Sequence, residues 1–225
     1  MDGAQLAKKL DYAFLKADSR ASIDEFKRAV RETQEHGLRA LCVPPVLAGT
    51  VKKNYPTLRV CAVVSYPLGL DSLAAKVFSA QELIEQGVDE LDVVLDLFAL
   101  SNNNRRKIEQ EALQLGELCE DASVICKAII ETPILSEEQI RWAVEVLRTS
   151  PVHCVKTSTG YSREPTSMDH VKLIRSVLGH DKQIKAAGGI RTLYQALAML
   201  EAGADIIGTS HAVAIVQEAL AEKTP

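Results

Sequence analysis

Short apolar runs alternate with segments of helical spacing along almost the whole chain, and this alternation limits the fold more than any other feature. The runs are rich in Val and Ile and lack a polar partner at every second position, which is typical of strands buried on both faces. They are ALCVP (40–44), RVCAVVS (59–65), ELDVVL (90–95), SVICKAIIE (123–131), VHCVK (152–156), QIKAAG (183–188) and ADIIGTS (204–210). No hairpin signal joins consecutive runs, so the pattern predicts a parallel sheet.

The segments between the runs carry helix start and stop signals. Residues 22–36 have apolar residues at helical spacing, and residues 71–86 begin with Asp and lead to Gly87. Two S/T-x-x-D/Q patterns, at 136–139 and 166–169, resemble capping boxes, and Thr192 opens a helix expected to end near Gly203.

A further run, LDYAF near residue 10, brings the number of expected strands to eight. Eight parallel strands with outer helices form a TIM (β/α)8 barrel, an α/β fold, and 225 residues with 47% hydrophobic residues suffice for one. We expect one domain over residues 1–225, since no Gly/Ser/Pro-rich linker divides the chain. An open doubly wound sheet is the alternative, but no G-x-G-x-x-G follows the first strand.

Composition excludes several classes of partner. The formal net charge of −4 gives no basic field for nucleic acid. The five cysteines show no C-x-x-C spacing and are expected to be reduced and buried. The N-terminal sequence lacks an apolar signal region and no run has membrane length, so we expect a cytoplasmic protein without membrane contact. The histidines lack metal-ligand spacing, so neither a metal nor another cofactor is expected.

Three lysines lie in strands that are expected to be buried on both faces, where burying an ammonium group costs free energy. Lys127, Lys156 and Lys185 lie in or at the end of predicted strands and are spaced 29 residues apart, which is one strand-helix unit. They should come from successive strands at similar heights. Each taken alone could point outward and reach water, because burying an unpaired ammonium is costly. Three together, with Asp92 in the preceding strand, indicate a site inside the barrel.

Two neighbouring lysines allow a chemistry that one does not. A lysine amine is a nucleophile only when unprotonated, and a second cation in a dry pocket lowers the pKa of the first. Such an amine attacks a carbonyl and forms a Schiff base, while Asp92 moves protons directly or through water. These residues predict carbon–carbon bond chemistry without a metal, but they do not rank Lys156 above Lys185.

The motifs CVKTSTGY, IKAAGGIRT, ELDVVLDLFAL, CKAIIET, SYPLG and ADIIGTS resemble those of the deoxyribose-phosphate aldolases. The resemblance covers roughly residues 9–217, and KTSTG followed by K-x-x-GGIRT is its most specific part. It implies a TIM barrel and a class I aldolase that interconverts 2-deoxy-D-ribose 5-phosphate with D-glyceraldehyde 3-phosphate and acetaldehyde.

The same resemblance implies residue roles. Lys156 of KTSTG corresponds to the lysine that forms the Schiff base, and Lys185 of IKAAGG to the lysine that lowers its pKa. Asp92 of LDVV corresponds to the acid/base aspartate. Lys127 of CKAIIET matches a further lysine of the site, which we expect to hold charge and water in place.

The substrate phosphate is expected at the loops after the last two strands, as is common in barrels. These loops are GGIRT (188–192) and GTSHA (208–212), with a helix N-terminus expected at Thr192 or Ser210. The predicted substrate-binding residues are Lys127, Thr157, Gly160, Gly188, Gly189, Gly208 and Ser210. The glycines alone would also suit ordinary turns, and Arg191 is expected to face solvent.

Several positions depart from the family pattern. Ala13 removes a hydroxyl where substrate polar groups are expected, Asp96 adds a carboxylate near the mouth, and His211 replaces a small residue. The loop after KTSTG reads YSREPTS, and the sequence ends AEKTP without the C-terminal tyrosine of some relatives. A related aldolase with another aldehyde acceptor, or a sugar-phosphate-binding barrel with weak or no turnover, therefore remains as an alternative. Association into a homo-oligomer is left open.

Overall fold

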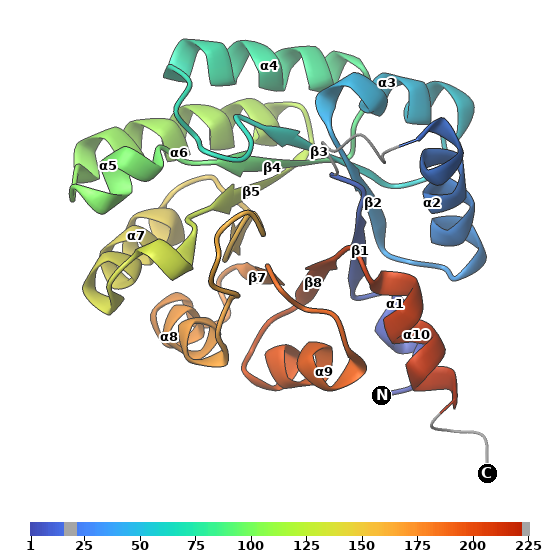
Figure 1. Ribbon diagram of the computed structural model, residues 1–225. Helices are drawn as coiled ribbons and strands as arrows, with labels where there is room; N and C mark the ends of the chain where they lie inside the picture. The colour runs from blue at the N-terminus through green and yellow to red at the C-terminus, as the bar shows by residue number, and fades with distance from the viewer. Residues whose placement is uncertain (16–21, 222–225) are drawn as a thin grey trace.

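The computed structural model describes residues 1–15 and 22–221, and within these ranges eight parallel strands close into a barrel in sequence order (Figure 1). Every predicted run contains a strand, although each strand is shorter than its run, and the open sheet is excluded. The strands are β1 (Leu10–Ala13), β2 (Ala40–Val43), β3 (Val60–Val64), β4 (Glu90–Val94), β5 (Ile125–Ile129), β6 (Cys154–Lys156), β7 (Gln183–Ala187) and β8 (Ile206–Thr209).

Helices surround the barrel, and α1 lies beside α10 next to β1 (Figure 1). They are α1 (Gly3–Ala7), α2 (Ile23–Glu35), α3 (Pro45–Asn54), α4 (Leu73–Glu85), α5 (Leu97–Ser101), α6 (Arg105–Asp121), α7 (Glu137–Thr149), α8 (Met168–Leu178), α9 (Leu193–Glu201) and α10 (Ala212–Ala221), with a 3-10 turn η1 (Thr132–Ile134) after β5. In the described residues no helix is both long and apolar enough to cross a membrane.

The predicted helix starts are largely confirmed. Ser136 and Thr192 form capping boxes at α7 and α9, in which the cap hydroxyl accepts from a backbone N–H and the third residue reaches back. The predicted box at 166–169 is wrong by one residue. Ser167 is the N-cap of α8, and its hydroxyl accepts from the His170 N–H. At α4 the cap is Ser72 rather than Asp71.

Strand register and side-chain alternation arrange the inward-facing residues in layers, each drawn from alternate strands. A floor layer contains Ala40, Glu90, Cys154 and Ile206. The next contains Asp11, Cys61, Lys127 and Lys185, and the one above it Cys42, Asp92, Lys156 and Gly208. The three lysines are therefore not level. Lys127 and Lys185 share a layer, and Lys156 lies one layer nearer the carboxyl ends of the strands.

The middle of this barrel is ionic rather than aliphatic. The side chains of Asp11, Glu90, Asp92, Lys127 and Lys185 are all almost fully buried. The apolar core lies mainly between the strands and the outer helices, where most of the buried Leu, Ile and Val residues pack. All five cysteines are free and buried, as predicted. Burying charges in a barrel costs desolvation energy even when every charge has a partner, and an aliphatic interior would avoid that cost. The ionic interior therefore indicates a functional centre.

Candidate active site

The carboxylate of Asp92 is the centre of the site, because three lysine amines converge on it. Lys127 Nζ lies 2.7 Å from Asp92 Oδ1, and Lys156 Nζ and Lys185 Nζ lie 2.7 Å and 2.8 Å from Oδ2. Strand order explains the convergence: β4, β5, β6 and β7 are consecutive, and all four side chains face inward. The structure thus brings together all three predicted strand lysines and the predicted aspartate.

Two of these lysines are held as cations. Burial by itself lowers the pKa of Lys127, but Asp92, Cys61 and Glu90 raise it well above the ordinary lysine value. Burial likewise lowers the pKa of Lys185, while Asp11 and Asp92 raise it well above that value. Burial raises the pKa of Asp92, but the three lysines lower it well below the ordinary range. An ionised Asp92 is therefore flanked by permanent ammonium groups.

Three more charged residues below Asp92 were not singled out from the sequence as site residues. Lys185 Nζ lies 2.6 Å from Asp11 Oδ2, and Lys127 Nζ lies 2.7 Å from Glu90 Oε2. Arg39 links these two carboxylates, with contacts of 2.5 Å to Asp11 Oδ1 and 2.6 Å to Glu90 Oε1. The signal available in the sequence was the placement of Asp11 and Glu90 inside apolar strand runs.

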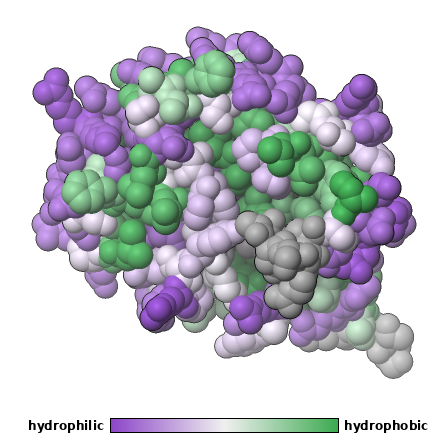
Figure 2. Space-filling model, turned by 45° about the horizontal axis from the view of Figure 1, so that its top comes forward, coloured by the Kyte–Doolittle hydropathy of each residue, from purple (hydrophilic) through white to green (hydrophobic). Residues whose placement is uncertain are grey.

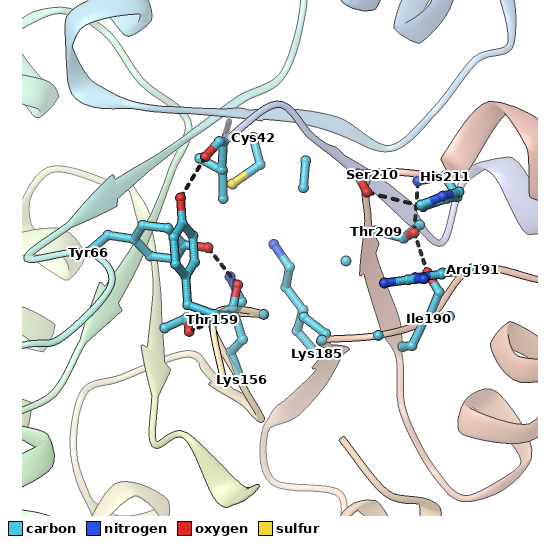
Figure 3. A pocket seen from close by; sticks show the side chains of 18 residues that line it. Cys42, Tyr66, Lys156, Thr159, Lys185, Ile190, Arg191, Thr209, Ser210 and His211 are labelled. Carbon is cyan, nitrogen blue, oxygen red and sulfur yellow. Dashed lines mark hydrogen bonds between the residues drawn. The ribbon is translucent and has the colours of Figure 1, made fainter. Parts of the chain in front are cut away.

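A cavity opens above this cluster at the carboxyl ends of the strands, where barrel enzymes carry their sites. The lining includes these predicted site residues: Lys156, Lys185, Gly160, Gly188, Gly189, Gly208 and Ser210. In Figure 3 the amine of Lys185 points into the cavity, with Lys156 and Tyr66 on one side and Arg191 on the other. Both lysines contact Asp92 and line the cavity, and Lys156 comes from the layer nearer the carboxyl ends of the strands.

Two glycines are required by close approaches. A Cβ at Gly208 would lie 2.9 Å from Lys185 Cε and 3.1 Å from Ala187 Cβ, so the missing side chain makes room for Lys185. Gly189 has a φ of +79°, and a Cβ there would lie 2.6 Å from Pro165 Cβ. Ordinary turns would not explain either approach, so these glycines shape the cavity wall.

Thr157 and Lys127 do not line the cavity. The Thr157 hydroxyl donates to the Ala187 carbonyl and accepts from the Ala187 N–H, both at 3.0 Å, so it joins β6 to β7. Lys127 lies beneath Asp92 with no exposed surface. The structure places both residues where they support the site from below or from the side, rather than at the surface a substrate would meet.

The loop after Lys156 is clamped from two sides. The Thr159 carbonyl accepts from the Tyr66 hydroxyl at 2.5 Å, and the Thr159 N–H donates to Glu131 Oε2 at 2.7 Å. Glu131 Oε1 also accepts from the Ser162 hydroxyl at 2.7 Å. The Tyr66 ring centroid lies 6.0 Å from Lys156 Nζ. Tyr66 and Glu131 therefore fix the cavity rim beside the Lys156 amine, a role that the sequence did not reveal.

Arg191 and His211 lie at the opposite side of the cavity from Tyr66 (Figure 3). The His211 N–H donates to Thr209 Oγ1 at 2.9 Å, and its Nδ1 lies 3.1 Å from the Ser210 hydroxyl. Arg191 is exposed, as expected, but its side chain also lines the cavity, which the sequence did not predict. A guanidinium, an imidazole, a hydroxyl and glycine backbone meet here, and these groups suit an anion.

Asp96 does not point to the barrel mouth, contrary to the concern raised by the sequence. Its Oδ1 accepts from the Ala99 N–H at the start of α5, and its Oδ2 pairs with Lys107. Its own N–H donates to Glu111 Oε2, whose other oxygen lies 2.8 Å from the buried amine of Lys76. Asp96 therefore belongs to the support of the chain after β4. The C-terminal residues 222–225 lie outside the described residues.

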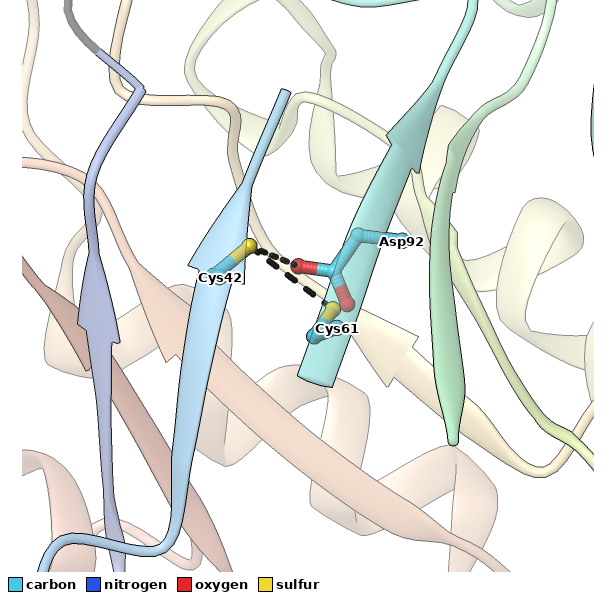
Figure 4. A group of neighbouring side chains, drawn as sticks. All are labelled: Cys42, Cys61 and Asp92. Atoms are coloured by element: carbon cyan, nitrogen blue, oxygen red, sulfur yellow. Dashed lines mark hydrogen bonds between the residues drawn. The ribbon is translucent and has the colours of Figure 1, made fainter. Parts of the chain in front are cut away.

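Cys42, Cys61 and Asp92 form a group with metal-ligand atoms close together (Figure 4). Cys42 Sγ lies 3.7 Å from Cys61 Sγ and 3.8 Å from Asp92 Oδ2. Both oxygens of Asp92 already contact lysine ammonium groups, and these positive charges oppose a divalent cation. The donor set therefore does not fit a metal, and the absence of a cofactor stays a prediction.

Comparison with known proteins gives a consistent result over nearly the full length. The family model of DeoC/LacD family aldolases matches residues 6–218. Deoxyribose-phosphate aldolase from Aquifex aeolicus is 38% identical over 217 residues, which cover 95% of each chain.

Solved structures agree. The aldolase QR15 is 35% identical with a TM-score of 0.90, and 96% of each chain is covered. A tetrameric deoxyribose phosphate aldolase from Aeropyrum pernix is 30% identical with a TM-score of 0.88, covering 96% of this chain and 91% of that one. By its sequence and its barrel, this chain belongs to the DeoC/LacD family of aldolases, which are lyases.

Proposed function

We propose that this protein cleaves 2-deoxy-D-ribose 5-phosphate to D-glyceraldehyde 3-phosphate and acetaldehyde through an imine on Lys156. The position of Lys156 carries the proposal. Its amine lies 2.7 Å from ionised Asp92 and lines the cavity. Lys127 and Lys185 are held in the protonated form, because each contacts a second carboxylate in addition to Asp92.

The chemistry follows from this placement. The unprotonated Lys156 amine attacks the aldehyde carbon, and loss of water from the carbinolamine gives an iminium. The iminium accepts the electron pair of the C2–C3 bond, the C3 hydroxyl loses its proton, and glyceraldehyde 3-phosphate leaves. Protonation of the remaining enamine and hydrolysis release acetaldehyde and the amine. Asp92 relays these protons, directly or through water, and its charge stabilises the iminium.

The other end of the cavity suits the substrate phosphate. Gly188, Gly189 and Gly208 provide backbone that an anion can approach, and α9 and α10 begin just beyond the two loops. We assign Arg191 and His211 to the phosphate together with Ser210. In this orientation the aldehyde end of the sugar lies towards Lys156 and the phosphate lies towards Arg191 and His211.

Covalent trapping tests the proposal directly. Incubation with acetaldehyde and borohydride, followed by peptide mass spectrometry, should place a two-carbon adduct on Lys156. Lys156→Ala should abolish both the adduct and the cleavage of deoxyribose 5-phosphate. Lys107→Ala is a control, since Lys107 is an exposed lysine on α6 and should leave both unchanged. An adduct on Lys185 with an unmodified Lys156 would contradict the assignment.

A second candidate is the same Schiff-base chemistry with another aldehyde acceptor. It is favoured by Ala13 and His211, both of which line the cavity and depart from the family pattern. A panel of retro-aldol substrates would distinguish the two, since a better substrate than deoxyribose 5-phosphate would establish the alternative. Stabilisation by deoxyribose 5-phosphate without any aldehyde product would instead indicate a binding protein.

We also propose a cytoplasmic homo-oligomer as the working form. The Aeropyrum pernix relative is tetrameric, and large apolar side chains are exposed at Phe78, Phe98 and Tyr194. Figure 2 shows apolar patches set among hydrophilic residues on one face. Light scattering on the purified protein measures the mass, and a monomer at micromolar concentration would contradict this part of the proposal.

A further inference from the structure

Six charged side chains in the barrel form a closed ring of ion pairs, which we call the ionic ring. Around the ring each member contacts the next at 2.5–2.8 Å. In order, the members are Arg39, Asp11, Lys185, Asp92, Lys127 and Glu90. Lys156 is attached to this ring through Asp92 but is not one of its members. The ring extends from the floor of the barrel to the level of the reactive amine.

The ionic ring is electrically neutral without Lys156. Its three cations, Arg39, Lys127 and Lys185, are balanced by three carboxylates. A protonated Lys156 would add a fourth positive charge to a region that is almost fully buried. Because the ring has no net negative charge left to balance this excess, the cost of burying the extra charge is not compensated. The unprotonated amine is the form that leaves the barrel interior neutral.

We propose that Arg39 and Glu90, at the floor of the barrel, are positioning residues that set the protonation of Lys156 through the charge balance of the ionic ring. The inference rests on the proposed role of Lys156 as the imine-forming residue. Neither residue lines the substrate cavity, so they act through Asp11, Lys127 and Asp92 rather than by contact with the substrate.

The other groups around Lys156 are the same in the parent and in variants of the floor residues. Lys156 contacts Asp92, lies 6.0 Å from the Tyr66 ring and shares its cavity with Cys42, Tyr161, Lys185, Arg191 and His211. Asp11, Cys61 and Lys127 occupy the layer of inward-facing residues below it. β8 presents Gly208 at the level of Lys156. Arg39 and Glu90 pair with two of these groups, Asp11 and Lys127, which makes them the adjustable part of the balance.

The expected effect is measurable. Glu90 and Asp92 are two residues apart on β4, which is about 7 Å along a strand. Adding the 2.7 Å between Asp92 and the Lys156 amine gives about 10 Å between that amine and the charge of Glu90. At an effective dielectric constant of about 20, one charge at that distance shifts a titration midpoint by about one pH unit.

The test uses variants that change the ring charge in opposite directions. Arg39→Met makes the ring negative, so protonated Lys156 is favoured and the acid midpoint of kcat/KM should rise by about one pH unit. Glu90→Gln makes the ring positive and should lower that midpoint by a similar amount. The double variant restores neutrality, and its midpoint should return to that of the parent. The substrate phosphate titrates equally in all of them and cancels in the comparison.

Two controls separate charge from structure. Arg39→Lys keeps the charge and should keep the midpoint. Arg59 also contacts Glu90, at 3.0 Å, but its side chain is 50% exposed, so Arg59→Gln should leave the profile unchanged because solvent screens the loss. A merely structural role would reduce activity in each single variant without opposite shifts and without recovery in the double variant.

The outcomes distinguish this inference from the function on which it rests. If the parent protein is not trapped at Lys156 by acetaldehyde and borohydride, the proposed function fails. If it is trapped but Arg39→Met and Glu90→Gln shift the midpoint in the same direction, or not at all, the ionic ring does not set the protonation of Lys156. Should Arg39→Met fail to fold, an unmoved midpoint in Glu90→Gln alone overturns the inference.

Discussion

Glu90 should give the protein an acid-sensitive share of its stability, and Glu90→Gln should remove it. Burial raises the pKa of the Glu90 carboxyl, but Lys127 and Arg39 outweigh burial and lower it to about 2. A carboxyl with a lowered folded-state pKa stabilises the fold above its unfolded pKa. That contribution is lost as the pH falls from the unfolded value, about 4.3, through the folded value.

The size of the effect follows from the two pKa values. A difference of roughly two units corresponds to about 3 kcal/mol in the free energy of unfolding, all of it present at neutral pH. At about pH 3, which is still one unit above the folded pKa, the parent should have lost about half of this amount. The amide that replaces the carboxyl does not titrate, so the difference in stability between parent and Glu90→Gln should shrink by about 2 kcal/mol between neutral pH and this acid pH.

Urea unfolding of parent and variant at pH 7, 5, 4 and 3 measures this difference. Gln114→Ala serves as a control, because Gln114 is exposed on α6 and has no titratable group, so its stability difference should not change with pH. A stability difference for Glu90→Gln that stays constant across the range would refute the reasoning, since it would mean that Glu90 has the same pKa folded and unfolded.

Three further perturbations follow from the same contacts. Asp92→Asn leaves the buried amines of Lys127, Lys156 and Lys185 without their common carboxylate. We expect kcat to fall by at least two orders of magnitude and stability to fall by about 3 kcal/mol, both measurable on one preparation by rate assay and urea unfolding. Gly208→Ala pushes a methyl group against Lys185 Cε, and it should lower kcat more than it raises KM for deoxyribose 5-phosphate; an unchanged kcat would contradict the close approach. Lys76→Met leaves Glu111 buried without its cation and should cost about 3–5 kcal/mol, most of which Lys76→Met/Glu111→Leu should restore if the ion pair alone is responsible.

The sequence predicted the fold because local signals agreed with one another. Apolar runs at the spacing of strand-helix units leave few arrangements other than a parallel barrel, and the capping box predicted at Ser136 and the helix start predicted at Thr192 are confirmed. At α8 two hydroxyl residues, Thr166 and Ser167, stand side by side, and only the path of the backbone decides which one caps the helix. Boundaries were therefore less certain than the elements themselves.

The candidate site was predictable where residue type conflicted with its surroundings. Lysine and aspartate inside apolar strands are costly, so Lys156, Lys185, Lys127 and Asp92 were conspicuous in the sequence. Thr157 was not separable from its neighbours, because a hydroxyl that bonds a strand and one that meets a substrate look alike before the strands are paired. The roles of individual site residues stay predictions until the trapping experiment is done.

By itself the sequence determined which residue types lie in each strand and how far apart they are along the chain, and this sufficed for the barrel and for a lysine-based chemistry. Only the tertiary structure decided which charges meet. Arg39, Asp11 and Glu90 come from different parts of the chain, and their pairing depends on the register between strands and on closure of the barrel. Contact between charges depends on distances in space, which spacing along the chain does not contain.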